Sequence, residues 1–182
     1  MFKNILIFIT ITLISLNSYA NNFQLVSSNL SSTKQINISQ ILNGYGCHGK
    51  NISPQLSWKN APTGTKSFAL TMYDPDALSG KGWWHWIVFN IPVNITHLDE
   101  NAGNSQSVNL PSHAIQSQTS FGTAEYGGPC PPAGDKSHRY IVTIYALKNT
   151  IPLNSKSSAV LVDTYIQKNK IVSASLTAMY QR

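Results

Sequence analysis

Charged side chains are scarce in this sequence, and those of one sign never form a dense group. Of its 182 residues, 13 are Lys or Arg and 7 are Asp or Glu, which gives a formal net charge of +6. The basic residues are scattered, and the densest group is only Lys168-Asn169-Lys170. A nucleic-acid groove needs clustered Lys and Arg with interleaved aromatic side chains. The sequence therefore argues against a nucleic-acid partner, and its excess positive charge indicates solubility or a mild attraction to anionic surfaces.

Long apolar runs are missing after the first residues of the chain. Lys3, the apolar stretch 5–16 and the small-x-small sequence Ser18-Tyr19-Ala20 have the order of a secretory signal peptide, residues 1–20. The apolar stretch is shorter than the ~20 residues of a typical membrane span, although an uncleaved anchor is the alternative. We expect cleavage after Ala20 and a periplasmic or secreted product. The mature chain, 21–182, then has no transmembrane segment and suits one domain with one core.

Cysteine occurs only twice, at Cys47 and Cys130. Disulfides persist in the compartments that exported proteins reach. Each cysteine lies in a segment rich in Gly or Pro, 44–49 or 127–134, and neither lies in an expected strand. We therefore expect a disulfide that fastens these two loops together, with two buried free thiols as the alternative.

Alternating apolar segments dominate the chain, and helical periodicity is rare. Segments 67–73 and 85–91 alternate as strands do, and 140–147 is apolar on both faces, which predicts a central strand. One helix is expected at 157–170, where Leu161 and Tyr165 recur at helical spacing. These patterns predict a mostly β fold: an antiparallel, Greek-key-like β-sandwich with peripheral helices, including one C-terminal helix. Shorter contributions to the sheets are expected from Phe23, Leu25, Ile36 and Ile38, from 56–58 and from 175–180.

Two segments place polar side chains at the ends of expected strands. Asp74-Pro75-Asp76-Ala77 contains a proline that favours a turn, and His85 follows it in a Trp-rich strand. The segment 127–134 is a stiff loop that leads through His138 to Tyr140 at the next strand entrance. Each segment alone is compatible with an ordinary turn and core aromatics. Together they can converge on one pocket whose aromatic walls exclude water.

In this order the segments resemble the phosphatidylethanolamine-binding protein family, also called Raf kinase inhibitor-like proteins, and especially its bacterial periplasmic branch. The resemblance runs from about Asn43 to Tyr180 and also includes Asn51-Ile52-Ser53-Pro54. One departure is Leu78, where relatives usually have proline, so we expect a looser turn. The resemblance implies a non-catalytic pocket, without cofactor or metal, for a small phosphate-containing or zwitterionic ligand such as a phospholipid head group. The ligand-binding residues that it implies are Asp74, Asp76, His85, Pro132, His138 and Tyr140.

Three other functions are compatible with these residues. Asp with His can act as a general acid and base in a hydrolase, but no Gly-x-Ser-x-Gly segment supplies a nucleophile and a disulfide explains Cys130 better. Two Asp and two His are also a plausible ligand set for zinc or manganese. Inhibition of a kinase or protease through a protein contact, which some family members carry out, is compatible with ligand binding. No segment identifies such a protein partner.

The two carboxylates raise an electrostatic difficulty for an anionic ligand. At ~4 Å and an effective dielectric constant of ~20, each repulsive contact with a phosphate costs about 4 kcal/mol. Protonated His85 and His138 would offset this repulsion. A zwitterion offers another solution, with its ammonium group directed to Asp74 or Asp76. We therefore expect phosphoethanolamine to bind better than inorganic phosphate at neutral pH, with a smaller difference in acid.

Overall fold

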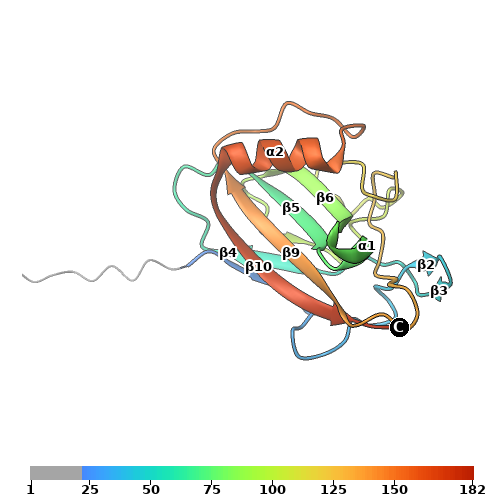
Figure 1. Ribbon diagram of the computed structural model, residues 1–182. Coiled ribbons are helices and arrows are strands. Elements are labelled where there is room, and N and C mark those ends of the chain that lie inside the picture. The colour runs from blue at the N-terminus through green and yellow to red at the C-terminus, as the bar shows by residue number, and fades with distance from the viewer. Residues whose placement is uncertain (1–21) are drawn as a thin grey trace, which may run out of the picture.

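The computed structural model describes residues 22–182, so the expected signal peptide lies outside the described residues (Figure 1). The fold is mostly β, as predicted, with antiparallel sheets and two short helices. A five-stranded sheet has the order β10-β9-β5-β6-β8, and a three-stranded sheet has the order β1-β4-β7. The strands are β1 (Gln24–Val26), β2 (Asn43–Gly44), β3 (Cys47–His48), β4 (Leu56–Lys59), β5 (Ser67–Asp74), β6 (Trp83–Pro92), β7 (His97–Leu98), β8 (Ile115–Gln116), β9 (His138–Leu147) and β10 (Lys170–Tyr180).

The two sheets pack face to face, which confirms the predicted sandwich. Trp58 of β4 meets Phe68 of β5 edge to face, with ring centroids 5.5 Å apart. Strand β9 is central, as expected, because it pairs with β5 on one side and β10 on the other. The other face of the large sheet is covered by the helix α2 (Ala159–Asn169), whose Val162 and Ile166 lie in a second apolar cluster (Figure 1). Burial on both faces explains why 140–147 lacks a polar side.

The predicted C-terminal helix is confirmed, and its bounds lie inside the expected range 157–170. Ser158 caps α2, since the Leu161 N–H donates to its hydroxyl oxygen at 3.3 Å. Ala159, Val162 and Ile166 are buried, whereas Leu161 is 43% exposed. The spacing of three, four and seven residues along this helix selects that face.

The first part of the chain contributes less to the sheets than predicted. Leu25 lies in β1 and is buried, as expected for a strand that covers the core. No strand forms at 36–38: Ile36 is buried beside a single bridge between Gln35 and Met179, and Ile38 is exposed. The separate hairpin of β2 and β3 carries Cys47 instead.

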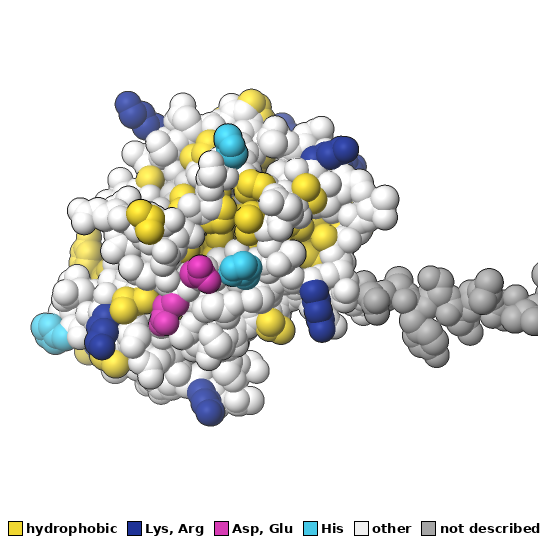
Figure 2. Space-filling view, turned by 180° about the vertical axis from the view of Figure 1, so that it is seen from behind, with side chains coloured by type: hydrophobic (Ala, Val, Ile, Leu, Met, Phe, Trp, Pro, Cys, Tyr) yellow, Lys and Arg dark blue, Asp and Glu magenta, His cyan; other side chains and the backbone are white. Residues whose placement is uncertain are grey.

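Charge and apolar surface are unevenly distributed on the outside of the molecule. On the face shown in Figure 2, apolar side chains gather near the centre, while Lys and Arg side chains stand apart from one another near the edges.

Within residues 22–182, no helix combines the length and apolar character that crossing a membrane requires.

The strand register brings three segments of the site to one edge of the large sheet. Asp74, at the end of β5, pairs with Trp83 at the start of β6. On its other side β5 runs antiparallel to β9, where Tyr73 pairs with Ile141. The turn after β5, which includes the short helix α1 (Ala77–Gly80), therefore lies beside the start of β9. This edge holds the pocket.

Candidate functional site

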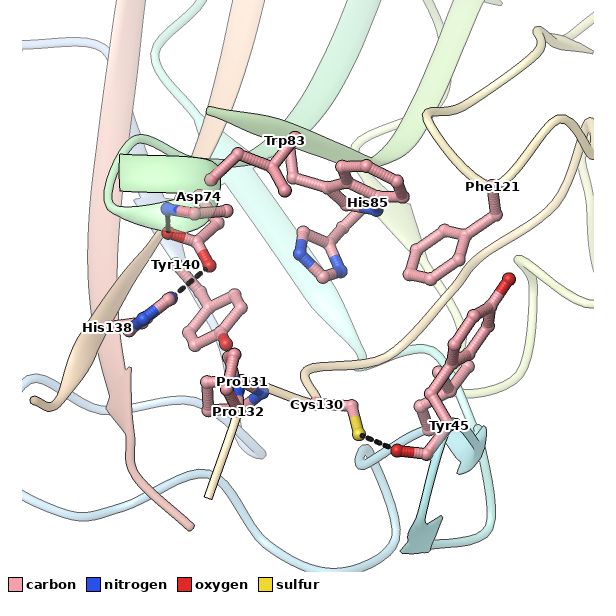
Figure 3. Close-up of a pocket in the computed structure, with 13 residues that line it drawn as sticks. Tyr45, Asp74, Trp83, His85, Phe121, Cys130, Pro131, Pro132, His138 and Tyr140 are labelled. Carbon is pink, nitrogen blue, oxygen red and sulfur yellow. Dashed lines mark hydrogen bonds and ion pairs between the residues drawn. The ribbon is translucent and has the colours of Figure 1, made fainter. Parts of the chain in front are cut away.

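A cavity of about 240 Å³ opens at this edge of the sheet (Figure 3). Its walls are mostly apolar, and its polar groups come from the ends of β5, β6 and β9. Five of the six expected ligand-binding residues line it, and Asp76 does not. The described residues that line the cavity are Leu42, Tyr45, Asp74, Ala77, Leu78, Trp83, His85, Phe121, Cys130, Pro131, Pro132, His138 and Tyr140.

Asp74 is buried at the end of β5 and both of its carboxylate oxygens are occupied. The N–H groups of Asp76 and Ala77 donate to Oδ1 at 2.8 and 3.1 Å, which folds the Asp-Pro-Asp turn around the side chain. The other oxygen, Oδ2, lies 2.7 Å from Nδ1 of His138. Nε2 of His138 lies 3.6 Å from the half-exposed carboxylate of Asp135. The carboxylate of Asp74 therefore positions the turn and the His138 ring.

The hydroxyl group of Tyr140 is a buried polar group with no protein partner. Tyr140 is 0% exposed, lines the pocket, and forms no hydrogen bond with any described residue. Burial, together with the negative charge of Asp74, raises the pKa of the Tyr140 phenol above its ordinary range. The group therefore stays protonated and offers an O–H donor to the pocket. An unsatisfied buried hydroxyl costs stability, which is consistent with a ligand that completes it.

His85 is buried in the pocket wall, where its protonation differs from the one expected. Its Nδ1–H donates to the backbone carbonyl of Gly127 at 2.7 Å, and the Gly127 N–H donates to the His85 carbonyl at 2.9 Å. Burial lowers the pKa of His85 to about 4, although the Gly127 hydrogen bond and the charge of Asp74 oppose this shift. The ring is neutral at neutral pH, so a protonated His85 cannot offset the carboxylates there.

The Gly- and Pro-rich loop that closes the pocket is fastened at several points. Cys47 and Cys130 form the predicted disulfide, with their Cα atoms 6.0 Å apart. Asn51 bridges the same loop, because its side chain donates to the Tyr126 carbonyl at 3.1 Å and accepts from the Gly128 N–H at 2.8 Å. A Cβ atom at Gly128 would overlap the backbone of residues 40–42. The loop is thus held by a covalent bond, a side-chain bridge and close backbone packing.

Asp76 points out of the pocket and forms an ion pair with Arg139. The Arg139 guanidinium donates to both carboxylate oxygens at 2.7 and 2.9 Å, and the Arg139 backbone N–H donates to the same group at 2.9 Å. These contacts hold the pKa of Asp76 at about 2, below its ordinary value of 3.8. Asp76 therefore clamps the turn to the start of β9 and, unlike Asp74, does not face the cavity.

Leu78, the departure from the family pattern, sits on a strained backbone at the pocket mouth. Leu78 and Ser79 have φ values of 50° and 56°, in the left-handed region that L-residues rarely adopt. Proline fixes φ near −65°, so the residue usual in relatives could not adopt this conformation. The Leu78 side chain lines the cavity and is 59% exposed.

An aromatic wall completes the pocket, and the sequence pattern indicated only part of it. The Trp83 and Phe121 rings meet edge to face with their centroids 5.4 Å apart, and the Tyr45 and Phe121 ring centroids lie 6.1 Å apart (Figure 3). Trp84 and Trp86, the other aromatics around His85, do not line the cavity. Tyr45 and Phe121 come from loops far from His85 in sequence, and no local pattern marks them as lining residues.

Metal ligands were one alternative interpretation of the Asp and His residues. Between residues 22 and 182, no three or more His, Cys, Asp or Glu side chains are grouped as a metal site requires. Asp74, His138 and His85 instead make hydrogen bonds to protein groups. The arrangement can receive a small polar group against Tyr140 and His85, with an apolar remainder against the aromatic wall.

Comparisons with known proteins agree with this architecture. The UPF0098 protein YbcL of Escherichia coli (strain K12) is 43% identical over 180 residues, which cover 98% of each chain. The UPF0098 protein YbhB of the same organism is 40% identical and covers 86% of this chain and 99% of its own. The crystal structure of E. coli YbcL, described as a member of the mammalian PEBP family, superimposes with a TM-score of 0.85 at 46% identity, covering 88% of this chain and 98% of that one.

A more distant structure shares the fold. The Chlamydia trachomatis homologue, described as a putative phosphatidylethanolamine-binding protein, gives a TM-score of 0.73 at 29% identity, covering 89% of this chain and 99% of that one. The family model of the phosphatidylethanolamine-binding proteins matches residues 31–181. That range contains the whole five-stranded sheet, the disulfide and every described residue of the pocket lining. The chain belongs to the phosphatidylethanolamine-binding protein family.

Proposed function

We propose that this protein binds a small phosphate-bearing compound, such as a phospholipid head group, in the pocket between Asp74 and Phe121. The observation that carries the proposal is the buried Tyr140 hydroxyl, which has no protein partner and lines the cavity. A phosphate oxygen would accept its hydrogen bond. The cavity of about 240 Å³, which Pro132 also lines, supports a small ligand group. Because disulfides persist outside the cytoplasm, the Cys47–Cys130 bridge supports a role after export.

The ligand is best pictured as a zwitterion whose cationic group lies against the aromatic wall. Asp74 is already occupied by two backbone N–H groups and His138, and Asp76 is paired with Arg139 outside the cavity. The sequence had suggested Asp74 or Asp76 as the main partner of an ammonium group. In the structure both carboxylates are already paired with protein groups, so neither is free for this role. Trp83 and Phe121 offer ring surfaces that attract cations. The negative charge of Asp74 adds a long-range attraction for the same group.

In this proposal the protein binds its ligand without catalysing a reaction on it. The described lining includes no serine or threonine, and its cysteine is in the disulfide, so a covalent intermediate has no obvious nucleophile. Measurement of ester and phosphate-ester hydrolysis tests this point. Turnover by the folded protein that is lost in His138→Ala would contradict it. A protein partner, such as an inhibited kinase or protease, remains compatible with a filled pocket.

Calorimetric titration with phosphoethanolamine and with inorganic phosphate tests the proposal. We expect phosphoethanolamine to bind more tightly at neutral pH. Tyr140→Phe should weaken its binding about tenfold, because one buried hydrogen bond of roughly 1–1.5 kcal/mol is lost. Tyr145→Phe is the matched control, since Tyr145 belongs to the apolar cluster under α2 and does not line the cavity. Equal affinity of the Tyr140→Phe variant and the control would contradict the proposed site.

A further inference from the structure

We infer that the mouth of the pocket docks on the surface of an anionic lipid bilayer, where the protein holds a phospholipid head group while the acyl chains stay in the membrane. The mouth consists of Tyr45, Leu78 and Pro132, the exposed residues of the described cavity lining. This inference rests on the proposed head-group binding and adds the surface at which the ligand is met. Three features support it: the small size of the cavity, two exposed apolar side chains, and a cation beside each of them.

The cavity is large enough for a head group and too small for a whole phospholipid. Its volume of about 240 Å³ is below the roughly 300–1,000 Å³ of pockets that enclose a drug-sized molecule. A second cavity, lined by residues of β1 and β10, shares no lining residue with the pocket and does not extend it. The acyl chains of a bound phospholipid therefore lie outside the protein. Because exposure of each methylene group to water is unfavourable, the chains stay in the bilayer.

The two apolar side chains of the mouth stand out from the protein surface. Tyr45 is 79% exposed in the turn between β2 and β3, and Leu78 is 59% exposed in α1. Figure 1 shows α1 and the β2–β3 hairpin at the same end of the molecule. The left-handed backbone of Leu78 is strained, and such strain is typical of functional sites. A tyrosine ring suits the head-group region of a bilayer, and a leucine side chain suits the boundary with the acyl chains.

Each of these apolar side chains has an exposed cation beside it. The Arg182 guanidinium donates to the Tyr45 carbonyl oxygen at 3.4 Å. The Lys81 backbone N–H donates to the Leu78 carbonyl oxygen at 3.3 Å, so Lys81 belongs to the same turn. Neither cation forms an ion pair with another described residue. A Lys or Arg near an anionic membrane surface strengthens binding about fivefold.

The acidic groups at this end of the molecule are engaged by other side chains. Asp76 is paired with Arg139, with nitrogen and oxygen atoms 2.7 Å apart. Asp74 is buried against His138, and the Asp135 carboxylate lies 3.6 Å from the other nitrogen of that ring. The two cations of the mouth therefore keep their charge for an anionic lipid surface. Attraction between exposed charges of this kind is screened by salt.

Co-sedimentation of the whole mature protein with vesicles tests the inference. Vesicles of phosphatidylethanolamine with a minority of phosphatidylglycerol are anionic, whereas vesicles of phosphatidylethanolamine and phosphatidylcholine carry no net charge. We expect at least about fivefold tighter binding to the anionic vesicles, and weaker binding as the salt concentration rises. Lys81→Gln combined with Arg182→Gln should remove most of this preference.

Tyr45→Ser combined with Leu78→Ser removes the apolar side chains of the mouth. We expect vesicle affinity to fall at least about tenfold, since burying one such side chain in an apolar environment is worth about that factor. Val108→Ser combined with Val160→Ser is the control, because both valines are exposed and neither lines the cavity. Tyr45 and Leu78 also line the cavity, so phosphoethanolamine calorimetry is repeated on the same variant. The loss of vesicle affinity should exceed the loss for the soluble head group.

A phospholipid that stays in the bilayer is not carried between membranes. We therefore expect no acceleration of labelled phosphatidylethanolamine transfer from donor to acceptor vesicles, and transfer that the protein accelerates overturns the inference. Phosphoethanolamine binding together with equal vesicle affinity of the two double serine variants overturns this inference alone. Failure to bind phosphoethanolamine overturns the proposed function and this inference with it. If Tyr45→Ser with Leu78→Ser does not fold, equal binding of the unaltered protein to both kinds of vesicle decides against the inference.

Discussion

Replacing both Cys47 and Cys130 with alanine tests how the pocket loop is held and how much the bridge stabilises the fold. The bridge closes a loop across a sequence separation of 83 residues. In the chain-entropy account, a loop of this size restricts the unfolded state by about 4–5 kcal/mol. Alanine is the better replacement because Cys47 is buried in the apolar core, where an unpaired serine hydroxyl would add its own cost. The expected loss is a large share of the roughly 5–15 kcal/mol that stabilises a typical domain.

The native pocket should survive this change better than the global stability does. The Asn51 side chain still bridges Tyr126 and Gly128, and the Leu42 N–H still donates to the Pro129 carbonyl at 3.2 Å. These contacts hold the loop on both sides of Gly128 without the sulfur atoms. We therefore expect phosphoethanolamine affinity to fall by less than tenfold, or about 1.4 kcal/mol.

Urea unfolding followed by near-ultraviolet circular dichroism measures the first effect, and calorimetry measures the second. With a slope of about 2 kcal/mol per molar urea, the midpoint should fall by about 2 M. Reductant should shift the unaltered protein in the same direction and leave the double variant unchanged. A stability loss below about 1 kcal/mol would refute the entropic argument. An affinity loss far above tenfold in a folded variant would show that the bridge, and not the hydrogen bonds, holds the pocket.

Three further outcomes are expected. Arg139 holds the pKa of Asp76 at about 2, below 3.8, so this pair stabilises the fold fully above about pH 4 and loses its effect as the pH falls toward 2. In Asp76→Asn, the free energy of unfolding measured with urea should depend less on pH across that window. An unchanged pH dependence would contradict the role of the clamp. Asn51→Ala should lower the free energy of unfolding by about 1–3 kcal/mol because it leaves two backbone groups of the pocket loop without their partner; a thermal unfolding midpoint equal to that of the unaltered protein would count against this. N-terminal sequencing of the exported protein should begin at Asn21, and a full-length cytoplasmic product would be inconsistent with cleavage after Ala20.

The sequence by itself was enough to predict the longest strands and the C-terminal helix, because these depend on short-range patterns. Alternation over 67–73 and 85–91 marks β5 and β6, and the serine cap marks the start of α2. The disulfide followed from having only two cysteines in a chain that we expect to be exported. The helical spacing did not show which side chains are buried: Leu161 belongs to the repeat and is exposed, because the sheet covers the face that carries Val162 and Ile166.

The tertiary structure alone decided which of the expected side chains enter the pocket and in what state. Asp76 follows Asp74 by two residues, yet the position of Arg139 across the turn draws it outward. The charge of His85 depends on burial by Phe121 and Tyr140 and on the Gly127 carbonyl, all distant in sequence. Burial and pairing are properties of the assembled sheet edge, set by register and by loop packing, and no spacing of residues along the chain encodes them.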